Sequence, residues 1–370
     1  MNAHLPGSNL SRILIVALAL TLALVPLASA QEGPAMPLAE PGPYGVGEKR
    51  VTLVDPDREG RALVVMIWYP AQAGAVSYVM PKRDAEPDAT GAPYPLIIYS
   101  IPLWSTATLS VAEYLVTHGY VVASIQHPEP IGDPNFWTGV VDRPLDILLV
   151  LDQLPALSGA EIAGMVDAES VGIAGYSYGG MTSLWMAGAP IDPEYLASWC
   201  AANEPGATPN TSFSGSSCEV FLTRWTELSV YRGRFGALAE GNVWPPLKDE
   251  RIDAVFSIAP CFSPLIGEEG PAAVNVPTLV VYPEKDEICK PSDGARVIYE
   301  HLGSADRYLL TLLDAGHASV MELSSDKSLL RQVGVAFFGY YLQGREEYAQ
   351  YLTEEYVESL PNVAWESSLE

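Results

Sequence analysis

The sequence predicts an α/β fold: a mostly parallel, twisted sheet with helices on both faces and a lid insertion. Short apolar runs alternate with amphipathic segments along most of the chain. Alternating strands and helices require crossover connections, which place helices on both faces of a parallel sheet. One stretch, 190–250, is too long for an ordinary connection and therefore predicts the inserted lid.

The first expected strands are Arg50–Asp55 and Ala62–Tyr69, joined by a turn at Pro56–Arg61. The run Leu96–Ser100 is short and continuously apolar, which is typical of a strand in the middle of a parallel sheet. The sheet is then completed by further short apolar runs. These are Val121–Gln126, Val171–Ala174, Ala254–Ala259, Thr278–Tyr282 and Arg307–Leu313.

Helical periodicity separates these strands. The expected helices are Leu109–Thr117, Asp142–Leu157, Met181–Ala187, Ser292–Leu302 and Lys327–Gln343. We expect one folded domain over 48–345, preceded by a Pro- and Gly-rich extended leader at 31–47. An acidic, partly helical tail is expected at 346–370.

Residues 1–30 predict an export signal. Arg12 precedes the apolar run Ile13–Val25, and Ala28-Ser29-Ala30 provides the small residues of a cleavage site. The run is shorter than the about 20 apolar residues of a spanning helix, although an uncleaved anchor is the alternative. We therefore expect a periplasmic or extracellular protein with no stable membrane anchor after signal cleavage.

Charge excludes some classes of partner. The chain has 370 residues, 45 of them acidic and 20 basic, and a formal net charge of −25 at pH 7. Such a surface argues against a nucleic-acid partner, because no basic surface is available to displace phosphate counterions. A hydrophobic fraction of 48% excludes a disordered chain. The oligomeric state stays open.

Four cysteines in an exported chain predict two disulfides, for which three connectivities exist. Cys200 and Cys218 flank a loop rich in small and polar residues, and closing it would stabilise the fold by about 3 kcal/mol. Cys261 and Cys289 then form the second pair, which would tie the acid-bearing loop described below to a neighbouring strand. No CxxC spacing or histidine cluster indicates a metal site, and no cofactor is expected.

Residues 175–179 read Gly-Tyr-Ser-Tyr-Gly, the G-x-S-x-G pattern, and Gly180 extends it. The pattern alone is weak evidence. Here, however, an apolar strand leads into it and a helix of small residues follows. That setting predicts a nucleophile elbow, whose sharp turn needs small residues two positions either side of the serine. Ser177 is the candidate nucleophile; an idle serine in a glycine-rich turn is the alternative.

A serine hydroxyl needs a base to become a good nucleophile, and the chain has few histidines. His4 lies in the signal, whereas His118 (in a turn) and His301 (at a helix end) are expected to be structural. His317 follows the last strand, and the order serine, acid, histidine is the one this architecture requires. We predict His317 as the base, with His127 as the alternative.

The acid is expected on the loop that follows Thr278–Tyr282, because that loop can reach the base. It contains Glu284, Asp286 and Glu287. Asp286 is the best placed of the three, and the two glutamates are alternatives.

An oxyanion needs two backbone donors. We predict the N–H groups of Tyr178, next to the nucleophile, and of Leu103, after Leu96–Ser100, since Pro102 lacks an N–H. Several side chains after strand ends are expected to line the substrate pocket, although plain packing explains each equally well. They are Trp104, His127, Phe136 and Trp137.

A family resemblance extends over most of residues 50–342. Its stretches are Asp55–Ala71, Leu115–Pro128, Arg143–Leu154, Val171–Gly180 and Pro277–Asp286, followed by Gly316-His317. Over them the chain resembles the α/β-hydrolase superfamily, and most closely secreted bacterial relatives of plasma-type platelet-activating-factor acetylhydrolase, often labelled predicted dienelactone hydrolases. The family usually has His-Gly where this chain has Ile101-Pro102, and His where it has Tyr176.

Carried over by position, the resemblance implies Ser177, Asp286 and His317 as nucleophile, acid and base, with Leu103 and Tyr178 as oxyanion donors. It implies a serine esterase that cleaves a small-molecule carboxylic ester through an acyl-enzyme. A cutinase-like polyester hydrolase, an amidase, a peptidase or a lactonase would use the same triad. A non-catalytic binding protein is the alternative from another class. The acyl and alcohol groups of the substrate stay open.

Overall fold

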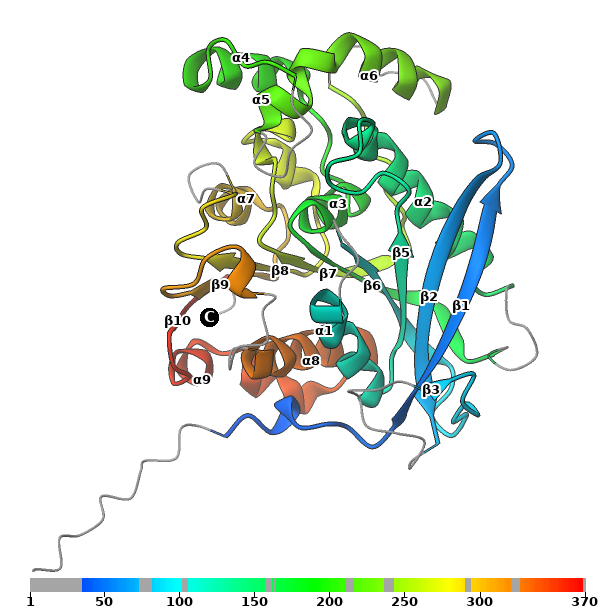
Figure 1. The fold of residues 1–370 in the computed structure, drawn as a ribbon. Coiled ribbons are helices and arrows are strands. Elements are labelled where there is room, and N and C mark those ends of the chain that lie inside the picture. Colours follow the sequence, from blue (N-terminus) through cyan, green and yellow to red (C-terminus); the bar gives the residue numbers. More distant parts are fainter. Residues whose placement is uncertain are drawn as a thin grey trace, which may run out of the picture. The chain divides into compact units, whose positions relative to one another are not determined.

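The structure, a computed structural model, describes residues 35–72, 82–101, 106–156, 162, 164–209, 216–235, 243–289, 294–320 and 327–368. The α/β class predicted from the sequence is confirmed. The described residues form one mixed ten-stranded sheet, in the order β10-β9-β8-β7-β6-β4-β5-β2-β1-β3 (Figure 1). The predicted signal, residues 1–30, lies outside the described residues.

The centre of the sheet is parallel. Each strand of this centre pairs in parallel with its neighbours. The strands are β4 (Tyr94–Ser100), β5 (Val121–Gln126), β6 (Val166–Tyr176), β7 (Ile252–Ile258), β8 (Thr278–Pro283) and β9 (Arg307–Leu312). Their carboxyl ends consequently lie side by side at one end of the strands, which we call the carboxyl edge. The residues discussed below are found there.

Antiparallel strands lie next to the parallel centre at both ends of the strand order. On one side, β2 (Arg61–Ala71) pairs with β5 and β1 (Gly45–Asp55) pairs with β2, and the short β3 (Lys82–Arg83) runs parallel to β1. Strand β1 begins at Gly45, so the predicted leader 31–47 ends too late: the backbone of 45–47 already pairs with 69–71.

Helices cover both faces of the sheet, and successive residues of one strand pack under different helices. On β4, Ile98 belongs to the core under α2 (Gly139–Gln153), α3 (Tyr178–Met186) and α7 (Ala295–His301). Ile97 belongs to the core under α1 (Thr106–Thr117) and α8 (Lys327–Gln343). Both isoleucines are fully buried, which is why these strands are apolar without alternation.

The stretch between α3 and β7 is largely helical. We call residues 190–250 the helical insertion; its described part contains α4 (Pro193–Asn203), α5 (Ser217–Val220) and α6 (Trp225–Arg232). The helices expected from the sequence include none in this stretch, so these three are a correction. In Figure 1 they lie outside α2 and α3, on the side away from the sheet. The predicted pair Cys200 and Cys218 is found at disulfide distance and joins α4 to α5.

Short 3-10 turns occur at several connections. They are Pro37–Ala39, Phe136–Thr138, Leu222–Arg224, Gly233–Phe235, Ser263–Leu265, Gly270–Ala273, Ala318–Val320 and Glu346–Leu352. Among the described residues, no helix combines the length and the apolar character needed to cross a bilayer.

The C-terminal segment contributes to the sheet. After the short helix α9 (Glu354–Glu358), β10 (Val363–Ser367) pairs antiparallel with β9. Trp365 on β10 is 3% exposed, and its ring centroid lies 5.3 Å from that of Tyr308. The predicted domain end at 345 therefore leaves out a strand that forms one edge of the sheet.

Candidate active site

Ser177 lies on a sharp turn that requires a glycine two positions before it and another two positions after it. It has φ 58° and ψ −118°, a strained conformation for a residue with a side chain, and α3 begins immediately after it. A Cβ on Gly175 would overlap the carbonyl of Gly179, and one on Gly179 would overlap the carbonyl of Ser100. Close approach of β6, α3 and β4 therefore requires these glycines.

Three predicted residues meet at the carboxyl edge of the sheet. His317 Nε2 lies 3.0 Å from Ser177 Oγ, and His317 Nδ1 lies 2.7 Å from Asp286 Oδ2. The side chains come from the segments after β6, β8 and β9 and are at most 5% exposed. Because the carboxylate only accepts, Nδ1 donates to Asp286, which leaves Nε2 to accept the Ser177 hydroxyl proton.

Backbone donors hold Asp286 in place. Its Oδ1 accepts the N–H of Ile288 at 2.9 Å and of Cys289 at 2.6 Å, while Oδ2 faces His317. The two alternative acids are used elsewhere. Glu284 accepts the N–H of Asp314, and Glu287 accepts the N–H of His317 at 3.1 Å.

Tyr176 supports the histidine from the side of the sheet. Its hydroxyl donates to the His317 carbonyl at 2.9 Å, and the two ring centroids lie 5.0 Å apart. Together with Glu287, it fixes both the N–H and the carbonyl of His317. In the sequence, Tyr176 is only a departure from the pattern of the resembled family, and nothing local to its position indicates this contact.

The second predicted cysteine pair is also found, and it lies against the same atoms. Cys261 and Cys289 have Cα atoms 5.0 Å apart. Cys261 Sγ lies 3.3 Å from Ser177 Oγ, and Cys289 Sγ lies 3.9 Å from His317 Nε2. The Cys261 N–H also donates to the Ser177 carbonyl. Each cysteine thus contacts the serine–histidine–aspartate set through both sulfur and backbone.

The start of α3 offers backbone donors beside the serine. The first intrahelical acceptor there is the Ser177 carbonyl, which binds the N–H of Met181. Earlier N–H groups, including that of Tyr178, lack an intrahelical partner, as at the start of any helix. Leu103 and Trp104, predicted as oxyanion donor and pocket residue, lie outside the described residues.

Arg143, near the start of α2, contacts both the Ile101 backbone and the Tyr178 ring. Its Nη1 donates to the carbonyl of Ile101 at 3.1 Å, and its guanidinium lies 4.4 Å from the centre of the Tyr178 ring. The side chain is 1% exposed, and its Nε and Nη2 have no hydrogen-bond partner. Within the described ranges no carboxylate forms an ion pair with it. Burial lowers the pKa of this guanidinium.

His127, the alternative base, is bound elsewhere. Its Nδ1 lies 2.8 Å from Asp146 Oδ2, and Asp146 also binds Arg58 and Arg61 at 2.7 and 2.8 Å. His127 is buried and its Nε2 has no partner. Burial, reinforced by the nearby positive charge of Arg143, lowers the pKa of His127 to about 4. The histidine that contacts Ser177 is His317.

The aromatic residues expected in the pocket are packed against neighbours. Phe136 is 2% exposed, with its ring centroid 4.9 Å from that of Tyr178. Trp137 is half-buried and meets Tyr231 of α6 edge-on. These contacts correspond to the packing alternative for both residues.

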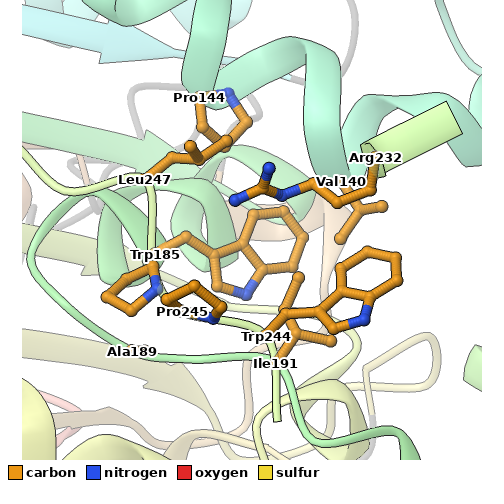
Figure 2. A pocket seen from close by; sticks show the side chains of 10 residues that line it. Val140, Pro144, Trp185, Ala189, Ile191, Arg232, Trp244, Pro245 and Leu247 are labelled. Carbon is orange, nitrogen blue, oxygen red and sulfur yellow. The ribbon is translucent and has the colours of Figure 1, made fainter. Parts of the chain in front are cut away.

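A separate small pocket lies between α2, α3 and the helical insertion (Figure 2). It is lined by Val140, Pro144, Trp185, Ala189, Ile191, Arg232, Trp244, Pro245, Pro246 and Leu247. The buried Arg232 points into it in Figure 2, and its Nη1 has no hydrogen-bond partner. Ser177, Asp286 and His317 do not line this pocket.

No protein-family model and no curated protein matches the chain. Its function is therefore argued from the fold and from the geometry around Ser177.

Replacing Gly179 with alanine tests the packing of the turn. The added Cβ would meet the Ser100 backbone, which cannot move without shifting β4. We expect Gly179→Ala to lower the free energy of unfolding by about 1–3 kcal/mol or more, measured by urea denaturation. Gly233→Ala is the matched control, because no atom lies within 4 Å of its Cβ position. Equal effects of the two substitutions would contradict this account.

The environment of His127 makes stability depend on pH. Its folded-state pKa of about 4 lies below the ordinary 6.5, so on acidification the unfolded chain takes up this proton first. The contribution is complete above 6.5 and is lost as pH falls toward 4, with a slope of up to about 1.4 kcal/mol per pH unit. Urea unfolding across this window should show a shallower pH dependence for His127→Gln than for the wild type. An unchanged slope would exclude this role.

Proposed function

We propose that this protein is an exported carboxylic-ester hydrolase of the α/β-hydrolase type, with Ser177 as nucleophile, His317 as base and Asp286 as acid. One observation carries the proposal: the hydrogen-bonded chain from Asp286 through His317 to Ser177. The strained serine between a parallel strand and a helix, in the chain order serine, acid, histidine, agrees with it. Export is supported by the signal-like residues 1–30 and by the two cysteine pairs.

The mechanism follows from these contacts. His317 Nε2 takes the Ser177 proton as Oγ attacks the ester carbonyl, and the imidazolium that forms is stabilised by Asp286 through Nδ1. His317 then gives the proton to the leaving alcohol. In the second half, His317 activates a water that releases the acyl group from Ser177. The backbone contacts of Asp286 and His317 keep the imidazole oriented through both halves.

The oxyanion is assigned to the N–H groups of Tyr178 and Leu103. Arg143 is proposed as a positioning residue, because it binds the carbonyl of Ile101, two positions before Leu103 in the sequence, and packs on the Tyr178 ring. Its buried charge has no directly paired carboxylate among the described residues, so it would also favour negative charge developing nearby. This supplies a physical role for Arg143 where the chain lacks the His-Gly of the resembled family.

The helical insertion is proposed as the lid. Phe221, which follows α5, has its ring centroid 6.1 Å from that of Tyr178, and Phe262 lies between them at 5.1 and 5.3 Å. A displacement of the insertion would therefore reach the residue that follows the nucleophile. Lids of this kind control water access and substrate entry in hydrolases.

Substitution of the nucleophile is the direct test. Ser177→Ala should lower the turnover of p-nitrophenyl acetate by about 10⁴- to 10⁶-fold and abolish labelling by a fluorophosphonate, because triad members act as one unit. Ser183→Ala, a buried serine on the same helix, is the matched control and should keep both. Undiminished hydrolysis by Ser177→Ala would overturn the proposal. Parallel assays with amide and lactone substrates decide among the acyl-transfer alternatives.

The role proposed for Arg143 predicts an effect on kcat and little effect on KM. Arg143→Met should lower kcat by about 10- to 100-fold with little change in KM, and should weaken binding of a boronic-acid transition-state analogue by a similar factor. Arg143→Lys keeps the charge but loses the planar fork and should recover only part of the loss. Arg307→Met, at the amino end of β9 and bound to the Leu302 and Ser304 carbonyls, is the control and should leave kcat unchanged. Equal losses in the two methionine variants would mean that Arg143 acts only on folding.

A further inference from the structure

The two sulfurs of the Cys261–Cys289 disulfide lie beside His317. With the S–S bond broken, the three side chains could ligate one metal ion. The ligand atoms of Cys261, Cys289 and His317 all lie within 4.8 Å of one another. Ser177 Oγ adjoins them, 3.3 Å from Cys261 Sγ and 3.0 Å from His317 Nε2. Two sulfurs, one imidazole nitrogen and one oxygen are the ligand types of a tetrahedral zinc site.

We propose that reducing this disulfide converts the candidate active site into a binding site for a soft divalent metal ion such as Zn²⁺ or Cd²⁺. The ligands are the thiolates of Cys261 and Cys289 and His317 Nε2, with Ser177 Oγ or a water in the fourth position. In the oxidised protein the sulfurs are bonded to each other, and the site is closed. The disulfide thus protects the serine and the histidine from metal ions.

The spacing suits such an ion. With metal–sulfur bonds of about 2.3 Å, a tetrahedral site needs ligand atoms separated by about 3.4–3.8 Å. The separations of Cys289 Sγ from His317 Nε2 and of Cys261 Sγ from Ser177 Oγ, 3.9 and 3.3 Å, are already close to this range. The two sulfurs must separate further, and breaking their bond permits that by side-chain rotation.

The surroundings of His317 match those of a metal-binding histidine. Such residues donate their other ring N–H to a carboxylate, which fixes the tautomer and raises the basicity of the ligating nitrogen. His317 Nδ1 makes this contact with Asp286 at 2.7 Å, and the carboxylate is itself held by two backbone N–H groups. The orientation that serves a general base therefore also presents Nε2 to a metal ion.

The chemistry balances with a phosphine as reductant. The S–S bond breaks as the phosphine gives up two electrons and takes the oxygen of one water, forming a phosphine oxide, and the two protons of that water give two thiols. The metal ion then displaces both thiol protons and forms two metal–sulfur bonds. Nε2 donates its lone pair to the metal, so it no longer accepts the Ser177 proton. The last consequence, loss of hydrolysis, rests on the function proposed above.

Cadmium binding tests the site without reference to catalysis. In a Cys200→Ser/Cys218→Ser background only the pair in question remains. After phosphine reduction, one Cd²⁺ per chain should produce the thiolate-to-cadmium charge-transfer absorption, which the oxidised protein should lack. Adding Cys261→Ser should reduce the band to that of a single thiolate. Adding His317→Gln should weaken Cd²⁺ binding by at least the about 10-fold that changes around metal ligands typically cause.

Two outcomes would overturn the inference: no band in the reduced background protein, or Cd²⁺ affinity unaffected by His317→Gln. Should the background variant fail to fold, reduced wild type provides the second measurement. There Zn²⁺ should block fluorophosphonate labelling, and a chelator should restore it; labelling that is insensitive to Zn²⁺ contradicts the site. Failure of the proposed function is distinguishable, because oxidised wild type would then not label at all, while the cadmium band is unaffected.

Discussion

The backbone at Ser177 is the constraint on which the site depends. A serine with positive φ ends the central strand β6 and begins α3 within one residue. This is possible only because Gly175 and Gly179 let strand, helix and the end of β4 approach without a side chain between them. The serine N–H binds the Ile258 carbonyl at the end of β7, so the turn is also held to the neighbouring strand. The hydroxyl is thereby directed to the edge where the segments after β8 and β9 bring Asp286 and His317.

Among the residues that the structure describes, two buried histidine–carboxylate pairs have different surroundings. Asp286 holds His317 through Nδ1, and the other ring nitrogen, Nε2, faces the Ser177 hydroxyl. Asp146 holds His127, but it is shared with two arginines, and the free nitrogen of His127 has no partner. Burial, reinforced by the positive charge of Arg143, lowers the pKa of His127 and favours its neutral form. A contact with a carboxylate is therefore not enough to identify a histidine as a candidate base. The two pairs differ in what lies opposite Nε2, which is a serine hydroxyl only at His317.

The cysteine pairs also differ in what they hold. Cys200–Cys218 joins two helices of the insertion, away from the parallel strands. Cys261–Cys289 joins the segments after β7 and β8, and its backbone N–H groups bind the serine carbonyl and the aspartate. The second pair therefore combines a structural restraint with a chemical one, because its sulfurs fill space that a metal ion would otherwise share with His317.

Much of this arrangement was predictable from the sequence, because local patterns determined it. The continuous apolar runs predicted the parallel strands, and helical periodicity located α8 at the bounds that the structure has. The glycine spacing selected Ser177, and the small number of histidines favoured His317. The acid was predicted from its place after a strand, and the structure brings Asp286 and neither glutamate to the ring of His317. The pairing of Cys200 with Cys218 was expected from the loop that they flank, and Cys261 with Cys289 was then the remaining pair.

Contacts between segments far apart in sequence were decided only by the tertiary structure. Strand β10 was missed because its pairing with β9 depends on where the chain returns, and the helices of the insertion because they are short and their packing is not local. Tyr176 and Arg143 gave no signal of their own: their contacts with His317 and Ile101 cross 141 and 42 residues of chain. Sequence patterns report periodicity and local turn chemistry, whereas partners brought together by folding depend on the whole arrangement of strands.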